Sequence, residues 1–395
     1  MVIHEQANNT WLCETDGKVG IRNYLLVMST VVCSSFVTRR IADQVQGAVA
    51  VENPFGCGQL EPDLEITKRT LIGMAKNPNV GGVLVVGLGC EQIQADDLVK
   101  EIEKTGKPVE KVVIQEVDGG TPAAIERGVT LLRRMAEEVL SQRPEEVDLS
   151  NLVMGVECGG SDATSGLAAN PVVGYASDKL VDLGGTVILS ETPPEMIGAE
   201  DILAKRTVSR EVGDKIIRVV RKWVDLAASY GVDLVGTQPS PGNIAGGLTT
   251  IEEKSLGAII KGGSRPIQGV VDYAEEVRGG KGLWIMDTPG YDIMSVVGMV
   301  AGGATLVVFT TGRGTPTGNP IAPVIKVTAN PYTAKKMREN IDFDASTVTL
   351  GQETIEQAGE RLFKLIIDVA RGGKPTRAEL LGFREFVIHK IIPSF

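Results

Sequence analysis

Residues 82–91 read GVLVVGLGCE, a short apolar, β-branched run that ends in closely spaced glycines, a cysteine and an acid. This composition is typical of a buried strand in a parallel sheet, and the glycines permit a tight turn into the next helix. Further apolar strands are expected at 24–32, 48–51 and 109–114, each followed by a helical pattern. The alternation predicts a Rossmann-like α/β domain with a parallel sheet over residues 1–145.

A polar stretch that contains proline, SQRPEEVDL at residues 141–149, interrupts this pattern and is the best candidate for a domain boundary. Strands expected at 152–156, 186–189 and 282–286 alternate with helical segments in the same way. We therefore predict a second α/β domain over residues 146–395, which carries the catalytic groups.

The composition of the chain limits its partners. Its 395 residues include 40 Lys+Arg and 50 Asp+Glu, a formal net charge of −10. Without a block of basic residues, this charge argues against nucleic acid and anionic membranes as partners. Residues 293–310 are uncharged, but their glycines and β-rich end predict a buried helix, a turn and a buried strand rather than a membrane span. The polar start, MVIHEQANNTW, has no secretory signal, so we expect a cytoplasmic protein.

Five cysteines, at positions 13, 33, 57, 90 and 158, are the most informative residues. An odd count in a long chain without a secretory signal predicts reduced thiols rather than a disulfide framework. Cys33, Cys57, Cys90 and Cys158 each follow a predicted strand, at the sheet edge where α/β proteins bind ligands. No CxxC pair is present, which excludes a zinc ribbon.

Glycine closely flanks three of these thiols, as GCG at Cys57, GLGC at Cys90 and ECGG at Cys158. Such turns let the backbone approach a bulky inorganic group, and three thiolates can hold an iron–sulfur cluster that leaves one iron open to substrate. We predict a metal centre on these three cysteines, preferably such a cluster, with Cys33 as a fourth ligand or a neighbouring thiol. The alternative is that the cysteines are small buried apolar residues at strand ends.

The glycine turns also allow a nucleotide site as a weaker alternative. The sequence GLGCEQ lacks the third glycine of GxGxxG, and no GxxxxGKS/T motif is present.

Other polar side chains gather at predicted strand ends and in glycine-rich loops. Arg313, between two glycines in TTGRGT, is suited to hold a substrate carboxylate with two hydrogen bonds. Lys254 is a candidate general base if it is desolvated. The remaining candidates are Asp162 and Asp287, for orienting substrate or metal, and Ser161 and Asn243, for binding substrate. Each alone also fits a surface or capping role, but their shared location favours a site.

Several longer segments resemble the altronate/galactarate dehydratase family, from about residue 16 to the C-terminus. The segments are GIRNYLLVMSTVVCS, FGCG, GLGCE, ECGGSDATSGLAANPVVG, ILSETPPEMIGAE, PSPGNIAGGLTTIEEKSLG, MDTPGYD and TTGRGT. The resemblance implies loss of water from a 2,3-dihydroxy sugar acid such as altronate to give a 2-keto-3-deoxy acid. It also implies iron or another divalent metal, so mononuclear Fe²⁺ is our second choice after the cluster.

The chain differs from the family pattern in two respects. The GIRNY segment begins at Gly20, near the start of the chain, so we expect the small N-terminal domain of single-chain members to be absent and a separate small subunit and an oligomer to take its place. Histidine, common before the GCG turn in these dehydratases, is replaced by the segment NPFG at residues 53–56.

The C-terminal third is similar to the sulfolactate sulfo-lyase branch of the family, although that branch is expected to lack the Cys57 and Cys90 turns. A carbon–sulfur lyase acting on sulfolactate is therefore one alternative function. Both reactions begin with removal of the proton α to a carboxylate, so a site that stabilises an enolate serves both. The other alternative is a non-catalytic subunit that binds sugar acids.

Overall fold

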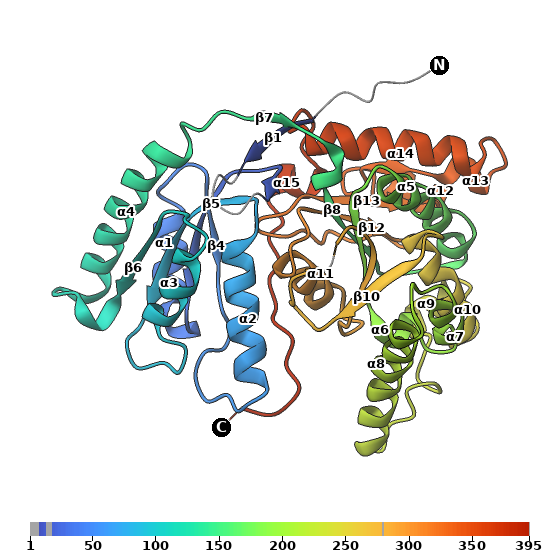
Figure 1. Ribbon diagram of the computed structural model, residues 1–395, viewed down its shortest axis with the longest axis horizontal. Helices are drawn as coiled ribbons and strands as arrows, with labels where there is room; N and C mark the ends of the chain where they lie inside the picture. Colours follow the sequence, from blue (N-terminus) through green and yellow to red (C-terminus); the bar gives the residue numbers. More distant parts are fainter. Residues whose placement is uncertain (1–7, 13–17, 279, 395) are drawn as a thin grey trace.

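The structure, a computed structural model, describes residues 8–12, 18–278 and 280–394. A four-stranded parallel sheet in the order β4-β3-β5-β6 forms the centre of the first domain (Figure 1). Its strands are β3 (Tyr24–Ser29), β4 (Ala48–Val51), β5 (Val80–Gly87) and β6 (Val109–Val113). Its helices are α1 (Ser35–Ala42), α2 (Asp63–Lys76), α3 (Ala95–Glu103) and α4 (Gly120–Val139).

Alternate side chains of these strands face two different helix layers. Leu25 and Val27 of β3 pack in a core with α1 and α4, whereas Leu26 and Met28 pack in a core with α2 and α3. Strands buried on both faces require apolar residues throughout, which is why 24–29 and 82–86 contain almost no polar residues. The predicted Rossmann-like α/β fold is confirmed.

A seven-stranded parallel sheet in the order β10-β11-β9-β8-β12-β13-β14 forms the second domain. Its strands are β8 (Val153–Cys158), β9 (Thr186–Leu189), β10 (Ile267–Val271), β11 (Gly282–Met286), β12 (Leu306–Thr310), β13 (Val324–Thr328) and β14 (Phe343–Asp344). The longer helices are α5 (Asn170–Asp182), α8 (Arg210–Ser229), α10 (Ile251–Ala258), α11 (Asp292–Ala301) and α14 (Ile355–Ala370). The short helices are α6 (Thr192–Glu195), α7 (Glu200–Lys205), α9 (Pro241–Ala245), α12 (Pro331–Lys336), α13 (Ser346–Thr349) and α15 (Arg377–Leu381).

The first strand of this sheet, β8, lies between β9 and β12, so the chain order reverses at β8. The crevice at the carboxyl ends of strands at such a reversal is the usual ligand site of open α/β sheets. The uncharged stretch 293–310 forms most of α11 and all of β12, as predicted. Within the described residues, no helix combines the length and the apolar character needed to cross a membrane.

The two domains share one hydrophobic core. It contains side chains of both sheets and of α2 and α11, which pack on each other between the sheets. Each of these helices follows a strand of its own sheet and runs from the carboxyl edge of that sheet to its amino edge. The two helices meet near their C-terminal ends, where a Cβ at Gly73 of α2 would lie only 2.3 Å from the carbonyl oxygen of Ala301, the last residue of α11. The helices therefore run in the same sense, and the carboxyl edges of both sheets face the same side of the molecule.

Polar contacts fix the domains at the amino-edge side. The Asn77 amide donates to the carbonyl oxygens of Val300 and Ala304, at 2.8 and 2.9 Å. Asn79 makes a second pair of such bonds, to the carbonyl oxygens of residues 305 and 321. A short antiparallel sheet, β2-β1-β7, adds a further link through β1 (Asn8–Leu12), β2 (Val19–Gly20) and β7 (Glu145–Val147).

The C-terminal segment 383–394, which we call the strap, joins the domains at the carboxyl-edge side (Figure 1). The backbone N–H groups of Ile391 and Ile392 donate to the two carboxylate oxygens of Asp63, at the start of α2. His389 packs between Trp223 and Tyr273 of the second domain. The strap therefore spans from the second domain to the first.

Candidate active site

A cavity of about 210 Å³ opens at the carboxyl ends of β8, β9 and β12, at the reversal of strand order. Its lining residues come from the strand ends and from the loops and helices that follow them. They are Cys158, Gly159, Gly160, Ser161, Glu191, Glu195, Gln238, Ser240, Gly242, Asn243, Lys254, Gly290, Asp292 and Arg313. All of them belong to the second domain.

The innermost wall is a buried network of a thiol, a carboxylate and an ammonium group. Lys261 Nζ lies 3.2 Å from Cys158 Sγ and 3.3 Å from Glu191 Oε2, and the Glu191 carboxylate also accepts the backbone N–H of Cys158 at 3.0 Å. Burial and the Glu191 carboxylate raise the pKa of the Cys158 thiol well above its usual value, so the thiol keeps its proton. Burial lowers the pKa of Lys261, but the neighbouring acidic groups, among them the Glu191 carboxylate, raise it by more, so Lys261 stays charged.

Glu191 has a strained backbone. Its φ and ψ are 66° and 53°, in the left-handed region, which a residue other than glycine adopts at a cost of about 1–3 kcal/mol. Its N–H donates to Thr288 Oγ1 at 2.8 Å, which fixes the turn after β9. The strain directs the carboxylate back toward the end of β8, where it meets Cys158 and Lys261.

A second buried ion pair lines the cavity. Lys254 Nζ lies 3.2 Å from Glu195 Oε1, and their side chains are 10% and 4% exposed. Burial lowers the pKa of Lys254, but Glu195 and its neighbours raise it by more, so the ammonium form is favoured. The other oxygen, Glu195 Oε2, is buried and has no hydrogen-bond partner in the protein.

Two further acids lie near these pairs. Glu157 accepts hydrogen bonds from Ser190 and Ser295, at 3.0 and 2.7 Å, and burial raises its pKa well above the usual value. Burial and the Glu191 carboxylate raise the pKa of Asp292, which lines the cavity, to about 7. With Glu157 protonated and Asp292 about half-protonated at neutral pH, the ammonium groups of Lys261 and Lys254 face the carboxylates of Glu191 and Glu195, and the network lies within about one charge of neutral.

Four of the predicted residues other than the cysteines line this cavity: Lys254, Arg313, Asn243 and Ser161. Arg313 is exposed at the mouth, where its guanidinium donates to the Gly242 carbonyl at 3.0 Å. Asn243 is buried, and its amide donates to the Ser161 carbonyl at 3.0 Å. Asn243 therefore ties the loop after β8 to α9.

Asp162 and Asp287 lie outside the lining residues and hold neighbouring elements. Asp162 Oδ1 accepts from the N–H groups of Thr164 and Ser165, and Oδ2 accepts from Asn330 at 2.7 Å. The carboxylate of Asp287 pairs with Lys222 and accepts the Trp223 indole N–H at 2.7 Å.

The structure separates the three predicted metal ligands. Cys158 is buried in the cavity of the second domain, whereas Cys57 and Cys90 are exposed on first-domain loops. Cys33, also exposed, lies beside these loops, and Cys13 falls outside the described residues.

Cys158 belongs to a group that could hold a metal ion, because its Sγ and carboxylate oxygens of Glu191 and Glu195 lie within 4.8 Å of one another. The free oxygen of Glu195 suits a cation. However, Lys261 and Lys254 already neutralise these ligands, so a metal ion would have to displace ammonium groups.

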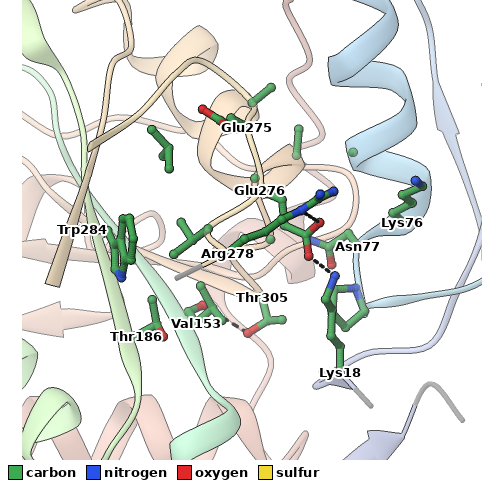
Figure 2. A pocket seen from close by; sticks show the side chains of 18 of the residues that line it. Lys18, Lys76, Asn77, Val153, Thr186, Glu275, Glu276, Arg278, Trp284 and Thr305 are labelled. Atoms are coloured by element: carbon green, nitrogen blue, oxygen red, sulfur yellow. Dashed lines mark hydrogen bonds and ion pairs between the residues drawn. The ribbon is translucent and has the colours of Figure 1, made fainter. Parts of the chain in front are cut away.

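A larger cavity, of about 1150 Å³, lies between the domains at the opposite edge of the second sheet. Val153 and Thr186, the first residues of β8 and β9, line it, which places it at the amino edge. Figure 2 shows Lys18 and Arg278 both paired with Glu276 in this cleft. The cleft lacks the strand carboxyl ends at which open α/β sheets bind ligands.

Sequence reasoning missed four acidic or basic groups of the cavity region, namely Glu191, Glu195, Lys261 and Asp292. Glu191 had a usable signal, because it lies two residues beyond the end of β9, just as Cys158 lies at the end of β8. Asp292 had a weaker one, because it begins α11, the helix that follows β11. Lys261 had none, because it lies in an apolar segment beyond α10 that reaches the site only in the folded chain.

Comparison with known proteins identifies the family. The sequence profile described as D-galactarate/Altronate dehydratase, C-terminal, matches residues 149–394. The profile described as D-galactarate dehydratase/Altronate hydrolase, second domain, matches residues 14–140. The chain belongs to the D-galactarate/altronate dehydratase family. The predicted membership of this family of hydro-lyases is therefore confirmed.

Relatives in this dehydratase family match nearly the whole chain. The (2R)-sulfolactate sulfo-lyase subunit beta of Chromohalobacter salexigens is 38% identical, over 96% of each chain. The altronate dehydratase of Bacillus subtilis is 34% identical, over 95% of this chain and 76% of the relative. The galactarate dehydratase (L-threo-forming) of Escherichia coli is 36% identical, over 93% of this chain and 73% of the relative.

Proposed function

We propose that this chain is the large subunit of a hydro-lyase that removes water from a sugar acid such as altronate to give a 2-keto-3-deoxy acid. The observation that carries the proposal is the second-domain cavity, in which two buried ammonium groups face two buried carboxylates. Loss of water from a 2,3-dihydroxy acid needs a group that takes the C2 proton and positive charge that stabilises the resulting enolate. The cavity offers both kinds of group.

Arg313 is proposed to bind the substrate carboxylate. It lies at the mouth of the cavity, and its guanidinium is exposed apart from the contact with the Gly242 carbonyl. A guanidinium can hold a carboxylate with two parallel hydrogen bonds. The bound carboxylate would then point inward toward Lys254, with Ser161 and Asn243 shaping the wall beside it.

Glu195 and Lys254 are proposed to act as a proton-transfer pair. Glu195 lines the cavity, and its Oε2 is buried and has no partner in the protein, so this oxygen is free to accept the proton from C2. Lys254 holds the other oxygen of Glu195 at 3.2 Å and keeps its proton. The sequence alone suggested Lys254 as the base; its charged state makes it better suited to stabilise the enolate and to donate a proton to the leaving hydroxyl.

Lys261 and Glu191 are proposed to fix the electrostatics behind the reacting atoms. Lys261 is completely buried, so its charge acts in a medium of low polarity, where it stabilises negative charge more strongly than in water. The strained turn at Glu191 holds that ammonium against Cys158. Asp162 and Asp287 are proposed to orient the site indirectly, through the loop after β8 and through α8.

Iron is proposed as the metal, as the family resemblance implies. When bound, it would supply a Lewis acid for the substrate's hydroxyl and carboxylate oxygens. Cys57 and Cys90 remain proposed ligands because their thiols are free and exposed, so a metal ion can reach them. Cys158 fits less well, because Lys261 lies 3.2 Å from its sulfur.

A small subunit is proposed to complete the enzyme. The relative from C. salexigens is named as a subunit beta. The profile that matches residues 14–140 is described as a second domain. The curated dehydratases extend beyond the matched region, which covers 76% or less of their length.

The second candidate function is a carbon–sulfur lyase acting on sulfolactate, favoured by the 38% identity to the sulfo-lyase subunit. Both reactions would use the same proton-transfer pair, so the leaving group decides between them. Purified full-length chain, with its small subunit, should be supplied with altronate, galactarate and sulfolactate in turn. Release of a 2-keto-3-deoxy acid supports the dehydratase, and release of sulfite supports the sulfo-lyase. Turnover of none of the three would favour a non-catalytic subunit that binds sugar acids.

The catalytic roles are tested in the same assay. Glu195→Gln and Lys254→Met should each lower kcat by at least about 100-fold, the usual loss when a general acid or base is removed. Arg313→Ala should raise KM more than it lowers kcat. Glu253→Gln makes the same chemical change at an exposed neighbouring position on α10, and it should leave kcat near that of the unaltered enzyme. Full activity of Glu195→Gln would remove that residue from the mechanism.

A further inference from the structure

We propose that Cys33, Cys57 and Cys90 together hold an iron–sulfur cluster at the carboxyl edge of the first-domain sheet, with Cys158 outside the ligand set. This inference deepens the proposed function, because it assigns the iron of that enzyme to the first domain, whose carboxyl edge faces the same side of the molecule as the cavity in which substrate reacts. It rests on the placement of three loops, on how they are tied together and on the surroundings of each thiol.

The three thiols follow three adjacent strands. Cys33 follows β3, Cys57 follows β4 and Cys90 follows β5, and β3 pairs in parallel with both of the others. The carboxyl ends of adjacent parallel strands lie at one edge of the sheet, so the three loops share that edge. Chain order reverses at β3, which makes this edge the ligand-binding position of the first domain, as the cavity is in the second.

Backbone hydrogen bonds connect the loops beside each cysteine. The N–H of Val32 donates to the Phe55 carbonyl at 3.1 Å, which links the Cys33 loop to the Cys57 loop. The N–H of Gln92 donates to the Gly56 carbonyl at 3.0 Å, which links the Cys90 loop to the Cys57 loop. Each bond lies within two residues of the cysteines that it connects, so the three thiols belong to one assembly of loops.

Two glycines keep that assembly close-packed. Gly56 and Gly89 have φ of 97° and 127°, and a Cβ on Gly56 would lie only 2.2 Å from the Thr30 carbonyl oxygen. The buried carboxylate of Glu91 accepts the N–H groups of Leu88 and Gly89, at 3.0 and 2.6 Å. The backbone around Cys57 and Cys90 is therefore held in place before any metal binds.

The spacing of the thiols favours a polynuclear cluster over a single ion. Two sulfurs on one tetrahedral ion lie about 3.8 Å apart, since each metal–sulfur bond is about 2.3 Å. Among the described residues, two sets of three potential ligand atoms lie within 4.8 Å of one another, and both sets belong to the second domain. The sulfurs of Cys33, Cys57 and Cys90 do not form such a set. In a cluster each thiolate binds a different iron, so its three sulfurs stand further apart than on one ion.

The surroundings of the sulfurs also fit a cluster. Cys33, Cys57 and Cys90 are free and exposed, so a metal centre can reach their sulfurs. The amide nitrogen of Gln115 lies 3.6 Å from Cys90 Sγ, as a donor to a sulfur ligand would. Three thiols would leave the fourth iron of a four-iron cluster without a cysteine, open to an oxygen ligand. Cys158, by contrast, is buried against an ammonium group.

The test measures iron and acid-labile sulfide in the full-length chain, purified without oxygen. We expect about four of each per chain, with the broad visible absorption of an iron–sulfur cluster. Cys33→Ser, Cys57→Ser and Cys90→Ser should each lose most of the iron, sulfide and absorption. Cys158→Ser, the matched control, should keep all three. Retention of the cluster by Cys33→Ser, or its loss from Cys158→Ser, would overturn the assignment.

A second measurement avoids substitutions that disturb folding. Alkylation of the unaltered chain, read by mass spectrometry, should find Cys33, Cys57 and Cys90 protected with iron present and reactive after the iron is chelated. Equal reactivity in both states would overturn the inference. Turnover by a chain that holds neither iron nor sulfide would do so too, and it would remove iron from the proposed function while leaving the proposed elimination reaction intact. A chain that holds the cluster but eliminates neither water nor sulfite from any of the three acids would contradict the function alone.

Discussion

At the scale of single residues, the buried ammonium of Lys261 is the most consequential group in the second domain. Its charge is compensated by Glu191 inside a region from which water is excluded. Lys261→Met should leave that carboxylate uncompensated, which typically costs about 3–5 kcal/mol of unfolding free energy. Urea denaturation measures the change. Arg338→Met, which removes an exposed ion pair with Glu339, is the control and should change stability by less than about 1 kcal/mol.

Lys326 makes stability depend on pH. Burial lowers its pKa to about 8, although Asp342 and Glu385 oppose the shift. The unfolded chain binds this proton up to pH about 10.5, so between pH 8 and 10.5 unfolding takes up a proton and this group makes the protein more stable as the pH rises. The gain should approach about 3 kcal/mol. Denaturation at several pH values should show this slope in the unaltered chain, and an equal slope in Lys326→Met would exclude Lys326 as its source.

At the scale of elements, the contact of α2 with α11 depends on one missing side chain. Any Cβ at Gly73 meets the Ala301 carbonyl oxygen, so Gly73→Val should push the two helices apart. Overpacking of this kind costs about 1–3 kcal/mol. Denaturation of the purified variant tests this, and an unchanged midpoint would mean that the helices can shift without cost.

The sequence predicted where strands end, but it did not predict which distant side chains meet at those ends. The strand ends at Cys90 and Cys158 could be predicted, because apolar runs that stop at glycine mark the edge of a parallel sheet. The pairing of Cys158 with Lys261 could not, because Lys261 enters the site from a 3-10 turn more than a hundred residues away. Asp287 was placed correctly at a strand end, yet its carboxylate turns to α8, which sequence spacing does not reveal.

At the scale of the whole molecule, the strap connects the two domains through Asp63. Its carboxylate accepts two backbone N–H groups, at 2.8 and 3.0 Å. Asp63→Ala should release the end of the strap and cost about 1–3 kcal/mol. Hydrogen exchange followed by mass spectrometry should show faster exchange in residues 386–394 and in the loop before α2. Exchange at the rate of the unaltered chain would show that other contacts hold the strap.

The division of the chain into two domains at residue 145 stays a prediction, which limited proteolysis can test.

The two domains are attached on opposite sides of a shared core. Hydrogen bonds from the side-chain amides of Asn77 and Asn79 join them at the amino edge, and the strap joins them at the carboxyl edge. Two bodies joined at both ends cannot swing about either join alone. In solution the molecule should therefore tumble as one object. Backbone amides of both sheets should report a single rotational correlation time in NMR relaxation, whether or not the cavity is filled. Ligands must then enter through local side-chain movement at the cavity mouth, and binding should leave the radius of gyration measured by X-ray scattering unchanged.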